Sequence, residues 1–227
     1  FLIMMAIGPR ISWIKQKYND FKSLIFILIL SCAINFLIFS FLKSYNLLSN
    51  LIIISSLFLI LYSLKDFIIN SKTKSYYNLP SFLSHTGFGI LMLFIILNHN
   101  FSKEYDLNIK VGETKKIDNI EIKFEDLKIK KKENYSVIIG DFNILDLNKN
   151  FRKNLNPEIR IYNNPQTLTF ESAIKTNLQQ DLYLTMSNID GSDFYNVKFQ
   201  IKPFMLWIWF AALLTASGGL LRTFLKK

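Results

Sequence analysis

The chain has 227 residues, half of them hydrophobic, and a formal net charge of +10 at pH 7. A strongly basic protein can bind nucleic acid, so the location of the charge matters. Residues 99–203 are close to neutral, because they hold 16 of the 27 basic and 15 of the 17 acidic residues. The positive excess therefore lies in short segments between apolar stretches, and no nucleic-acid partner is expected.

Four apolar stretches are long enough to cross a bilayer core, which takes roughly 17–25 residues. They cover residues 24–42, 47–64, 82–98 and 204–221. A shorter apolar stretch, residues 1–8, ends at Gly8-Pro9, a pair that terminates helices. The sequence therefore predicts a polytopic α-helical membrane protein with about four complete transmembrane helices and the end of a truncated one. Because no basic segment precedes residues 1–8, we expect a fragment or a split subunit rather than a cleaved signal peptide.

Basic residues gather in three segments, and the loop between the first two complete spans has only Lys43. The three segments hold Arg10, Lys15, Lys17 and Lys22; Lys65, Lys72 and Lys74; and Arg222, Lys226 and Lys227. The positive-inside rule places these segments in the cytoplasm. We therefore expect transmembrane helices with cytoplasmic loops over residues 1–98, a periplasmic domain over 99–203, and a last helix with a cytoplasmic tail over 204–227.

Residues 99–203 have the periodicity of strands. Apolar and polar side chains alternate over residues 120–125 and 195–201, and turn signals stand at 111–113 and 190–192. Shorter candidate strands cover residues 107–111, 135–139, 142–147, 159–162 and 182–186. The pattern predicts an inserted antiparallel β-domain, either a sandwich or a partly open barrel. No nucleophile has an evident histidine partner and no glycine-rich phosphate loop is present, so the domain is interpreted as a docking surface.

One histidine, His85, lies about one turn inside the apolar stretch 81–98. An ionisable residue in hydrocarbon is costly, so a functional role is the default hypothesis. At helical spacing His85 shares a face with Gly89, Met92 and Ile96. A planar cofactor could lie against this face with His85 as a ligand, or His85 could instead be hydrogen-bonded to a neighbouring helix. The residues alone leave both interpretations open.

Other polar or aromatic residues have simpler interpretations. His99, at the outer end of the same stretch, is expected to be an interfacial polar residue. Trp207 and Trp209 are expected to belong to an aromatic belt, and Gly218-Gly219 permits close helix contact. Cys32 is the single cysteine, so the chain holds neither an internal disulfide nor a Cys-x-x-Cys-His haem-attachment motif.

Several short motifs occur together in a recognisable order. They are Gly8-Pro9, Ser84-His85-x-Gly87, Arg160-x-Tyr162, Glu171-Ser172-Ala173-Ile174, Asp181-Leu182-Tyr183, Lys202-Pro203, Trp207-Ile208-Trp209 and Gly218-Gly219. In this order, between matching spans, they resemble the carboxy-terminal part of CcmF. CcmF is the haem lyase membrane subunit of the Ccm (system I) cytochrome c maturation pathway. The resemblance covers essentially the whole chain.

The resemblance implies a protein of the bacterial inner membrane, or of a mitochondrial inner membrane, that helps attach haem covalently to apocytochrome c. The implied partners are a CcmE-type haem chaperone and a CcmH-type thiol-reducing subunit. Family members also hold haem b within the membrane, and His85 matches one of its axial ligands. On this interpretation Gly89 and Met92 would face the haem.

The chain also departs from the family. CcmF has a tryptophan-rich segment flanked by two further histidines, and its second axial ligand for the b-type haem also lies upstream. None of these is found here, so the resemblance implies that the N-terminal half of the same lyase is a partner. The alternative is a non-catalytic membrane scaffold whose β-domain binds partners. A transporter subunit fits less well, since the sequence shows no internal repeat.

Overall fold

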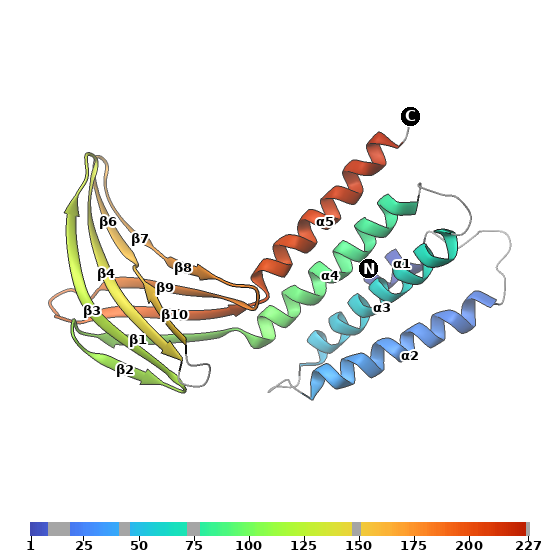
Figure 1. Cartoon of the computed structure of the whole chain (residues 1–227), viewed down its shortest axis with the longest axis horizontal. Coiled ribbons are helices and arrows are strands. Elements are labelled where there is room, and N and C mark those ends of the chain that lie inside the picture. Colours follow the sequence, from blue (N-terminus) through green and yellow to red (C-terminus); the bar gives the residue numbers. More distant parts are fainter. Residues whose placement is uncertain (9–18, 41–45, 72–77, 147–150, 226–227) are drawn as a thin grey trace. The chain divides into compact units, whose positions relative to one another are not determined.

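The computed structural model describes residues 1–8, 19–40, 46–71, 78–146 and 151–225. The chain divides into two compact units. The first, Phe1–Phe101 with Phe204–Lys227, is helical, and the second, Ser102–Pro203, is built of strands (Figure 1). A membrane unit thus contains an inserted β-domain between its last two helices.

The helical unit has five described helices. They are α1 (Leu2–Ile7), α2 (Asn19–Phe39), α3 (Leu47–Ser71), α4 (Asn78–Phe101) and α5 (Met205–Phe224). All but α1 are long and apolar enough to cross a membrane. α3 continues past residue 64 because apolar residues 67–69 follow Lys65 and Asp66, and α4 has Pro80 in its first turn, where proline is tolerated.

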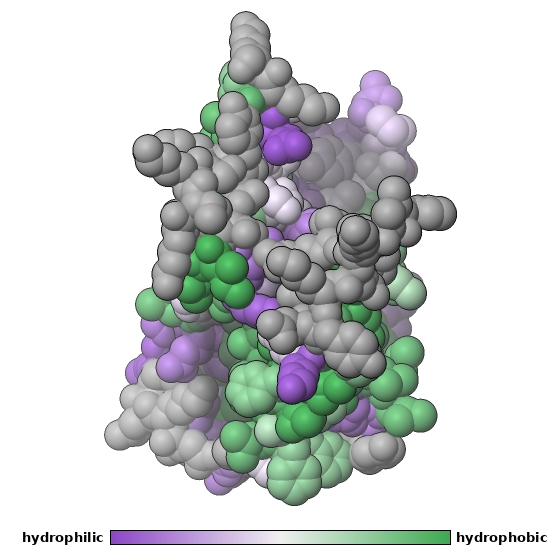
Figure 2. All heavy atoms as spheres, turned by 90° about the vertical axis from the view of Figure 1, so that its right-hand side faces the viewer, coloured by the Kyte–Doolittle hydropathy of each residue, from purple (hydrophilic) through white to green (hydrophobic). Residues whose placement is uncertain are grey.

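The long helices lie in a row, α2, α3, α4 and α5, and α1 contacts α3 and α4 (Figure 1). Half of the apolar span of α3 is buried, but only 11% of that of α5. Large apolar side chains on α2 and α5, such as Phe36 and Leu213, are correspondingly exposed. Apolar side chains also reach the face shown in Figure 2. Such surfaces suit lipid or further helices rather than water.

Glycines allow α4 to approach its neighbours closely on two sides. A Cβ at Gly89 would lie 2.7 Å from Ile60 Cγ1 and 3.2 Å from the Ser56 carbonyl oxygen of α3. On α5, a Cβ at Gly218 would lie 2.5 Å from the Ser84 nitrogen and 2.7 Å from the Pro80 carbonyl oxygen. Small residues at such crossings let helix backbones pack in lipid, where no hydrophobic force drives helices together.

Polar side chains also connect neighbouring helices. Asn35 Nδ2 on α2 donates a hydrogen bond of 3.0 Å to Asn50 Oδ1 on α3. Ser49 Oγ on α3 donates to Asn100 Oδ1 on α4 at 3.3 Å, and Ser84 Oγ on α4 donates to the Thr215 carbonyl oxygen on α5 at 3.4 Å. Each adjacent pair of long helices therefore shares at least one hydrogen bond.

The strand unit is a β-sandwich with antiparallel pairing throughout its described strands. One sheet has the order β1-β10-β9-β8, and the other β2-β3-β4-β6-β7, with β5 also paired to β4. The strands are β1 (Lys103–Ile109), β2 (Thr114–Ile117), β3 (Ile120–Lys131), β4 (Tyr135–Asp146), β5 (Phe151–Leu155), β6 (Glu158–Asn163), β7 (Gln166–Glu171), β8 (Ala173–Thr176), β9 (Gln180–Asn188) and β10 (Tyr195–Pro203). Of the two predicted architectures, the structure has the sandwich.

Alternate side chains from both sheets form the core of the sandwich. Phe124 and Phe142 stack with ring centroids 4.2 Å apart and are fully buried. Residues 135–139 and 142–147 were predicted as separate strands, but the structure joins them in β4 through Gly140. A Cβ there would lie 2.6 Å from the Phe142 ring and 2.9 Å from Met186 Sδ, so glycine keeps room for the core. Gly140, which lies between the two predicted strands, is thus explained by packing.

The close contact at Gly218 gives a first test. Gly218→Ala should lower the free energy of unfolding by about 1–3 kcal/mol, because the new methyl group meets backbone atoms of α4 that must move. Gly219→Ala is the matched control, since a Cβ at Gly219 meets no atom within 4 Å. Alanine also favours helix over glycine, so the control should leave stability equal or slightly higher. Thermal unfolding in detergent measures both, and equal effects would contradict the packing assignment.

Candidate functional site

His85 lies in the second turn of α4 and is half-buried. Among the described residues, its imidazole has no hydrogen-bond partner. The interpretation of His85 as a hydrogen-bonded contact between helices therefore finds no support in the described part of the chain. A half-buried imidazole without a protein partner keeps a nitrogen lone pair available for a ligand.

The two residues predicted to share the face of His85 have different surroundings. Gly89 is buried against α3, at the close approach described above. Met92, one turn further along, lines a cavity with Phe88. The structure therefore uses Gly89 for helix packing and leaves Met92 next to open space.

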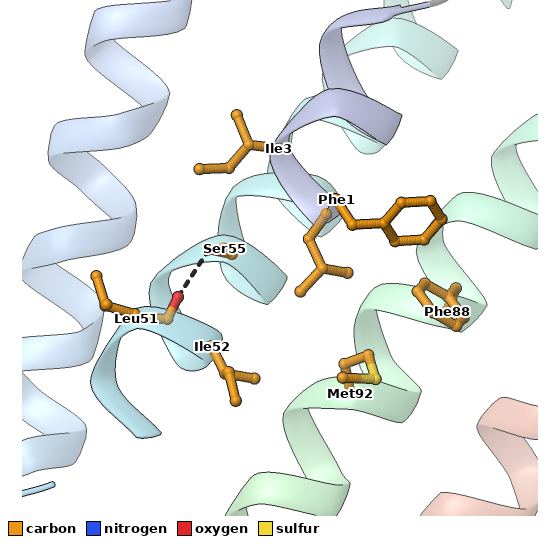
Figure 3. Close-up of a pocket in the computed structure, with 8 residues that line it drawn as sticks. Phe1, Ile3, Leu51, Ile52, Ser55, Phe88 and Met92 are labelled. Atoms are coloured by element: carbon orange, nitrogen blue, oxygen red, sulfur yellow. Dashed lines mark hydrogen bonds between the residues drawn. The ribbon is translucent and has the colours of Figure 1, made fainter. Parts of the chain in front are cut away.

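The cavity lies among α1, α3 and α4 and has a volume of about 310 Å³ (Figure 3). Its lining residues are Phe1, Leu2, Ile3, Leu51, Ile52, Ser55, Phe88 and Met92. Ser55 carries the one hydroxyl among these side chains and donates it to the Leu51 carbonyl oxygen at 2.7 Å. The lining is apolar, and it suits a hydrophobic group rather than a charged one.

Spacing along α4 limits what a single site can contain. Met92 follows His85 by seven residues, or about 10 Å along the axis, and His85 does not line the cavity. His99 is exposed in the last turn and follows His85 by fourteen residues, about 21 Å. The two histidines cannot ligate one iron atom. Within the described ranges, no three His, Cys, Asp or Glu side chains gather as a metal site.

Two groups of residues from the sequence motifs form clusters on the β-sandwich, one on each sheet. Arg160 pairs with Glu158 at 2.8 Å and with Glu171 at 3.8 Å, and its guanidinium lies 5.4 Å from the centroid of the Tyr135 ring. The hydrogen bond to Glu158, and then one to Tyr162, raise the pKa of Arg160, which keeps its charge at every accessible pH. β6 and β7 thus present a compact charged and aromatic cluster.

The second group lies on the other sheet. Tyr183 Oη donates to Asp181 Oδ2 at 3.3 Å, and Lys202 Nζ lies 4.8 Å from the centroid of the Tyr183 ring. Asp181 is only 6% exposed. Burial of the phenol, and then the charge of Asp181, raise the pKa of Tyr183. β9 and β10 therefore join residues that are about twenty positions apart in the sequence.

The chain is similar to known proteins over the β-sandwich and beyond it. Residues 100–203 match the family model described as the CcmF C-terminal beta-sandwich. The chain is 27% identical over its whole length to the cytochrome c-type biogenesis protein CcmF of Haemophilus influenzae, and 24% identical over 99% of its length to that of Escherichia coli. This chain resembles the carboxy-terminal part of CcmF. The resemblance seen in the sequence is confirmed.

The solved structure titled "Cytochrome c Heme Lyase CcmF" shows the same fold, with a TM-score of 0.75 over 96% of this chain at 15% identity. The chain spans 37% of that protein, and 37% and 35% of the two CcmF sequences. About a third of the length of these relatives is therefore represented here.

The sequence pattern did not predict the cavity. Its residues come from three helices, and α1 has only six residues. No periodicity in so short a helix indicates which neighbour it packs against. The apolar character of residues 1–8 was the only sequence feature that could have indicated the cavity. It predicted the end of a transmembrane span instead.

A polar network on the sheet of β1 and β10 allows a pH test. Lys198 forms an ion pair with Glu104, and Gln200 Nε2 donates to Glu104 Oε2 at 2.7 Å. The hydrogen bond from Lys198 is the largest cause of the lowered pKa of Glu104. Because that pKa is lowered, the contribution of the pair to stability is present above the ordinary glutamate pKa. It is lost as pH falls through the lowered value.

Lys198→Met should therefore raise the pKa of Glu104 toward the usual glutamate value. Carbon-13 NMR titration of glutamate carboxyl groups in the full chain measures this change. Lys116→Met removes a lysine that pairs with Glu121 on the other sheet, and it should leave the pKa of Glu104 unchanged. If Glu104 titrates identically in all three proteins, the assigned cause is wrong.

Proposed function

We propose that this chain is part of a membrane haem lyase for c-type cytochrome biogenesis, and that His85 supplies one axial ligand to a b-type haem within the membrane. The observation that carries the proposal is the half-buried imidazole on α4 that has no hydrogen-bond partner among the described residues. The likeness to CcmF over the whole chain supports it.

The residues near His85 fit a b-type haem. His85 offers a nitrogen ligand from an apolar helix, and the cavity beside Phe88 and Met92 offers apolar walls on the same side of α4. Gly89 brings α3 close and fixes the rotation of α4. When bound, the haem would supply one-electron transfer. The role of this chain is to hold and orient it in a water-poor setting.

A complete site needs a second ligand from elsewhere. His99 is too far along α4 to share an iron atom with His85, and these are the two histidines of the chain. The N-terminal half of the same lyase, in one polypeptide or as a separate partner, would supply the second ligand and the part that handles transferred haem. The chain represents 37% of the CcmF protein of Haemophilus influenzae, which agrees with such a division.

The β-sandwich would lie in the periplasm and dock the CcmE-type haem chaperone, the CcmH-type subunit or apocytochrome c. The location of the basic residues supports this topology in a bacterial inner membrane. The exposed edges and the Arg160 cluster supply charged and aromatic surface of the kind that partner recognition uses.

Replacement of His85 tests the haem proposal directly. In a purified complex of this chain with a polypeptide supplying the missing half, His85→Ala should reduce b-haem absorbance by at least about tenfold, since even residues that only orient a ligand cost that much when removed. His99→Ala is the matched control, because this histidine is exposed on the same helix, and it should keep the absorbance. Protein yield and thermal stability are measured in parallel.

Undiminished absorbance in the His85→Ala complex would rule out ligation by this residue. A wild-type complex that shows no Soret band when purified would instead favour the scaffold alternative, in which the β-domain holds partners together without a resident haem. The two results are distinct, since the first concerns one residue and the second the whole complex.

A further inference from the structure

Strand β7 lies at the edge of its sheet and has one free side. It pairs with β6, from Glu158 opposite Glu171 to Asn163 opposite Gln166, and with no other described strand (Figure 1). In an antiparallel strand, alternate residues direct their backbone N–H and C=O groups to opposite sides. β7 therefore presents a row of backbone donors and acceptors that another extended chain could meet.

The amino acids of β7 differ from those of the other edge strands. Five described strands, β1, β2, β5, β7 and β8, each pair with a single other strand. β7 has no lysine, whereas each of the other four has at least one. These lysines are Lys103, Lys115, Lys116, Lys153 and Lys175. Lysine on an edge strand opposes pairing with a further chain, because its charge would have to leave water. β7 lacks this protection.

Two large apolar side chains on β7 are half-exposed. Leu168 is 47% exposed and Phe170 is 46% exposed, and both lie on one face of the strand because they are two residues apart. Their partners on β6, Ile161 and Ile159, are more buried, and Ile159 belongs to the core of the sandwich. The apolar surface of the core thus continues to the edge and is left partly uncovered there. An added strand with apolar residues at alternate positions would cover it.

The opposite face of β6 and β7 has an excess of negative charge. The charged residues of these two strands are Glu158, Arg160 and Glu171. Arg160 pairs with Glu158 at 2.8 Å and with Glu171 at 3.8 Å, so one guanidinium serves two carboxylates. Glu171 lies on the edge strand, and its side chain is 45% exposed. A basic residue on an added strand could pair with Glu171, whereas a second copy of β7 would bring a further excess of negative charge.

We propose that the free edge of β7 binds an extended segment of a partner protein by strand addition. The segment has apolar residues at alternate positions, which cover Leu168 and Phe170, and a lysine or arginine on its other face beside Glu171. Backbone hydrogen bonds would supply affinity, and the two sets of side chains would supply specificity. This inference rests on the docking role proposed for the sandwich and gives the chemistry of the docked segment. It does not depend on haem ligation by His85.

The test uses a fluorescein-labelled peptide of roughly eight residues, the length of a strand, in which valine alternates with threonine and lysine. The full chain in phosphatidylcholine nanodiscs is titrated against it, empty nanodiscs serve as the blank, and fluorescence anisotropy measures binding. We expect saturable binding below about 1 mM. Amide hydrogen exchange in β7 should slow when the peptide is bound, because new backbone hydrogen bonds protect the amides. A peptide of the same composition with adjacent valines should bind roughly tenfold more weakly.

Two variants test the two faces of β7. Phe170→Lys should weaken binding by roughly fivefold or more, because it removes an apolar partner and adds a charge that repels the lysine of the peptide. Val111→Lys is the matched control: Val111 is 47% exposed in the turn between β1 and β2, which lie at the other ends of the two sheets, and the added charge is the same. Glu171→Gln should weaken binding of the lysine peptide but not of a peptide with threonine in its place. Thermal unfolding checks that each variant is folded.

Slower exchange of the β7 amides, together with weaker binding in Phe170→Lys but not in Val111→Lys, supports the proposal. No saturable binding to the wild-type chain, or equal losses in the two variants, overturns it. If Phe170→Lys does not fold, Glu171→Gln and hydrogen exchange in the wild-type chain still decide, since protection of other strands instead of β7 also overturns the site. A dimer in sedimentation that Phe170→Lys dissociates would show that a second copy occupies the edge, and the proposed partner would be wrong. The assay needs no haem, so its failure is distinct from failure of the haem proposal.

Discussion

The close packing of α4 between α3 and α5 determines where His85 lies. Gly89 allows the backbone of α3 to approach, and Ser84 meets Gly218 of α5 on another side of the helix. With both contacts in place, α4 cannot rotate without clashes or lost hydrogen bonds. The remaining face carries Phe88 and Met92 toward the cavity, and His85 precedes Phe88 by about one turn of the same helix. The position of His85 is therefore set by glycines at the two helix contacts.

The two units are stabilised by different forces. The sandwich buries large apolar side chains such as Phe124, Phe142 and Phe199 away from water, so the hydrophobic effect drives its folding. Lipid is as apolar as leucine, so the helical unit depends on close contact and on hydrogen bonds between helices, such as that of Asn35 with Asn50. Loss of a methyl group is thus most damaging in the core of the sandwich, and loss of close contact between backbones is most damaging where helices touch.

Strong alternation of apolar and polar residues indicated the central strands, whereas four strands with weak alternation were not predicted. Residues 120–125 and 195–201 alternate cleanly and lie in β3 and β10, whose inner faces form the core. Strands β2, β7 and β8 lie at sheet edges and β5 pairs only with β4, so little burial constrains their side chains. The segment Thr114–Ile117 has two consecutive lysines and was not recognised as a strand. Hydropathy likewise located the helices, but not which helix α1 contacts.

The sequence also predicted only part of the candidate site: it gave positions along one helix, but not the contacts between helices. Helical spacing alone placed His85, Gly89 and Met92 on neighbouring positions of one helix, yet only the packing of α3 shows that Gly89 serves a helix crossing. The rise of about 21 Å along α4 between His85 and His99 excludes the two histidines from binding one iron atom together. Under the proposed haem ligation, this chain would supply one axial ligand and another segment the second. A shared site of this kind would make haem binding depend on the joining of the two halves.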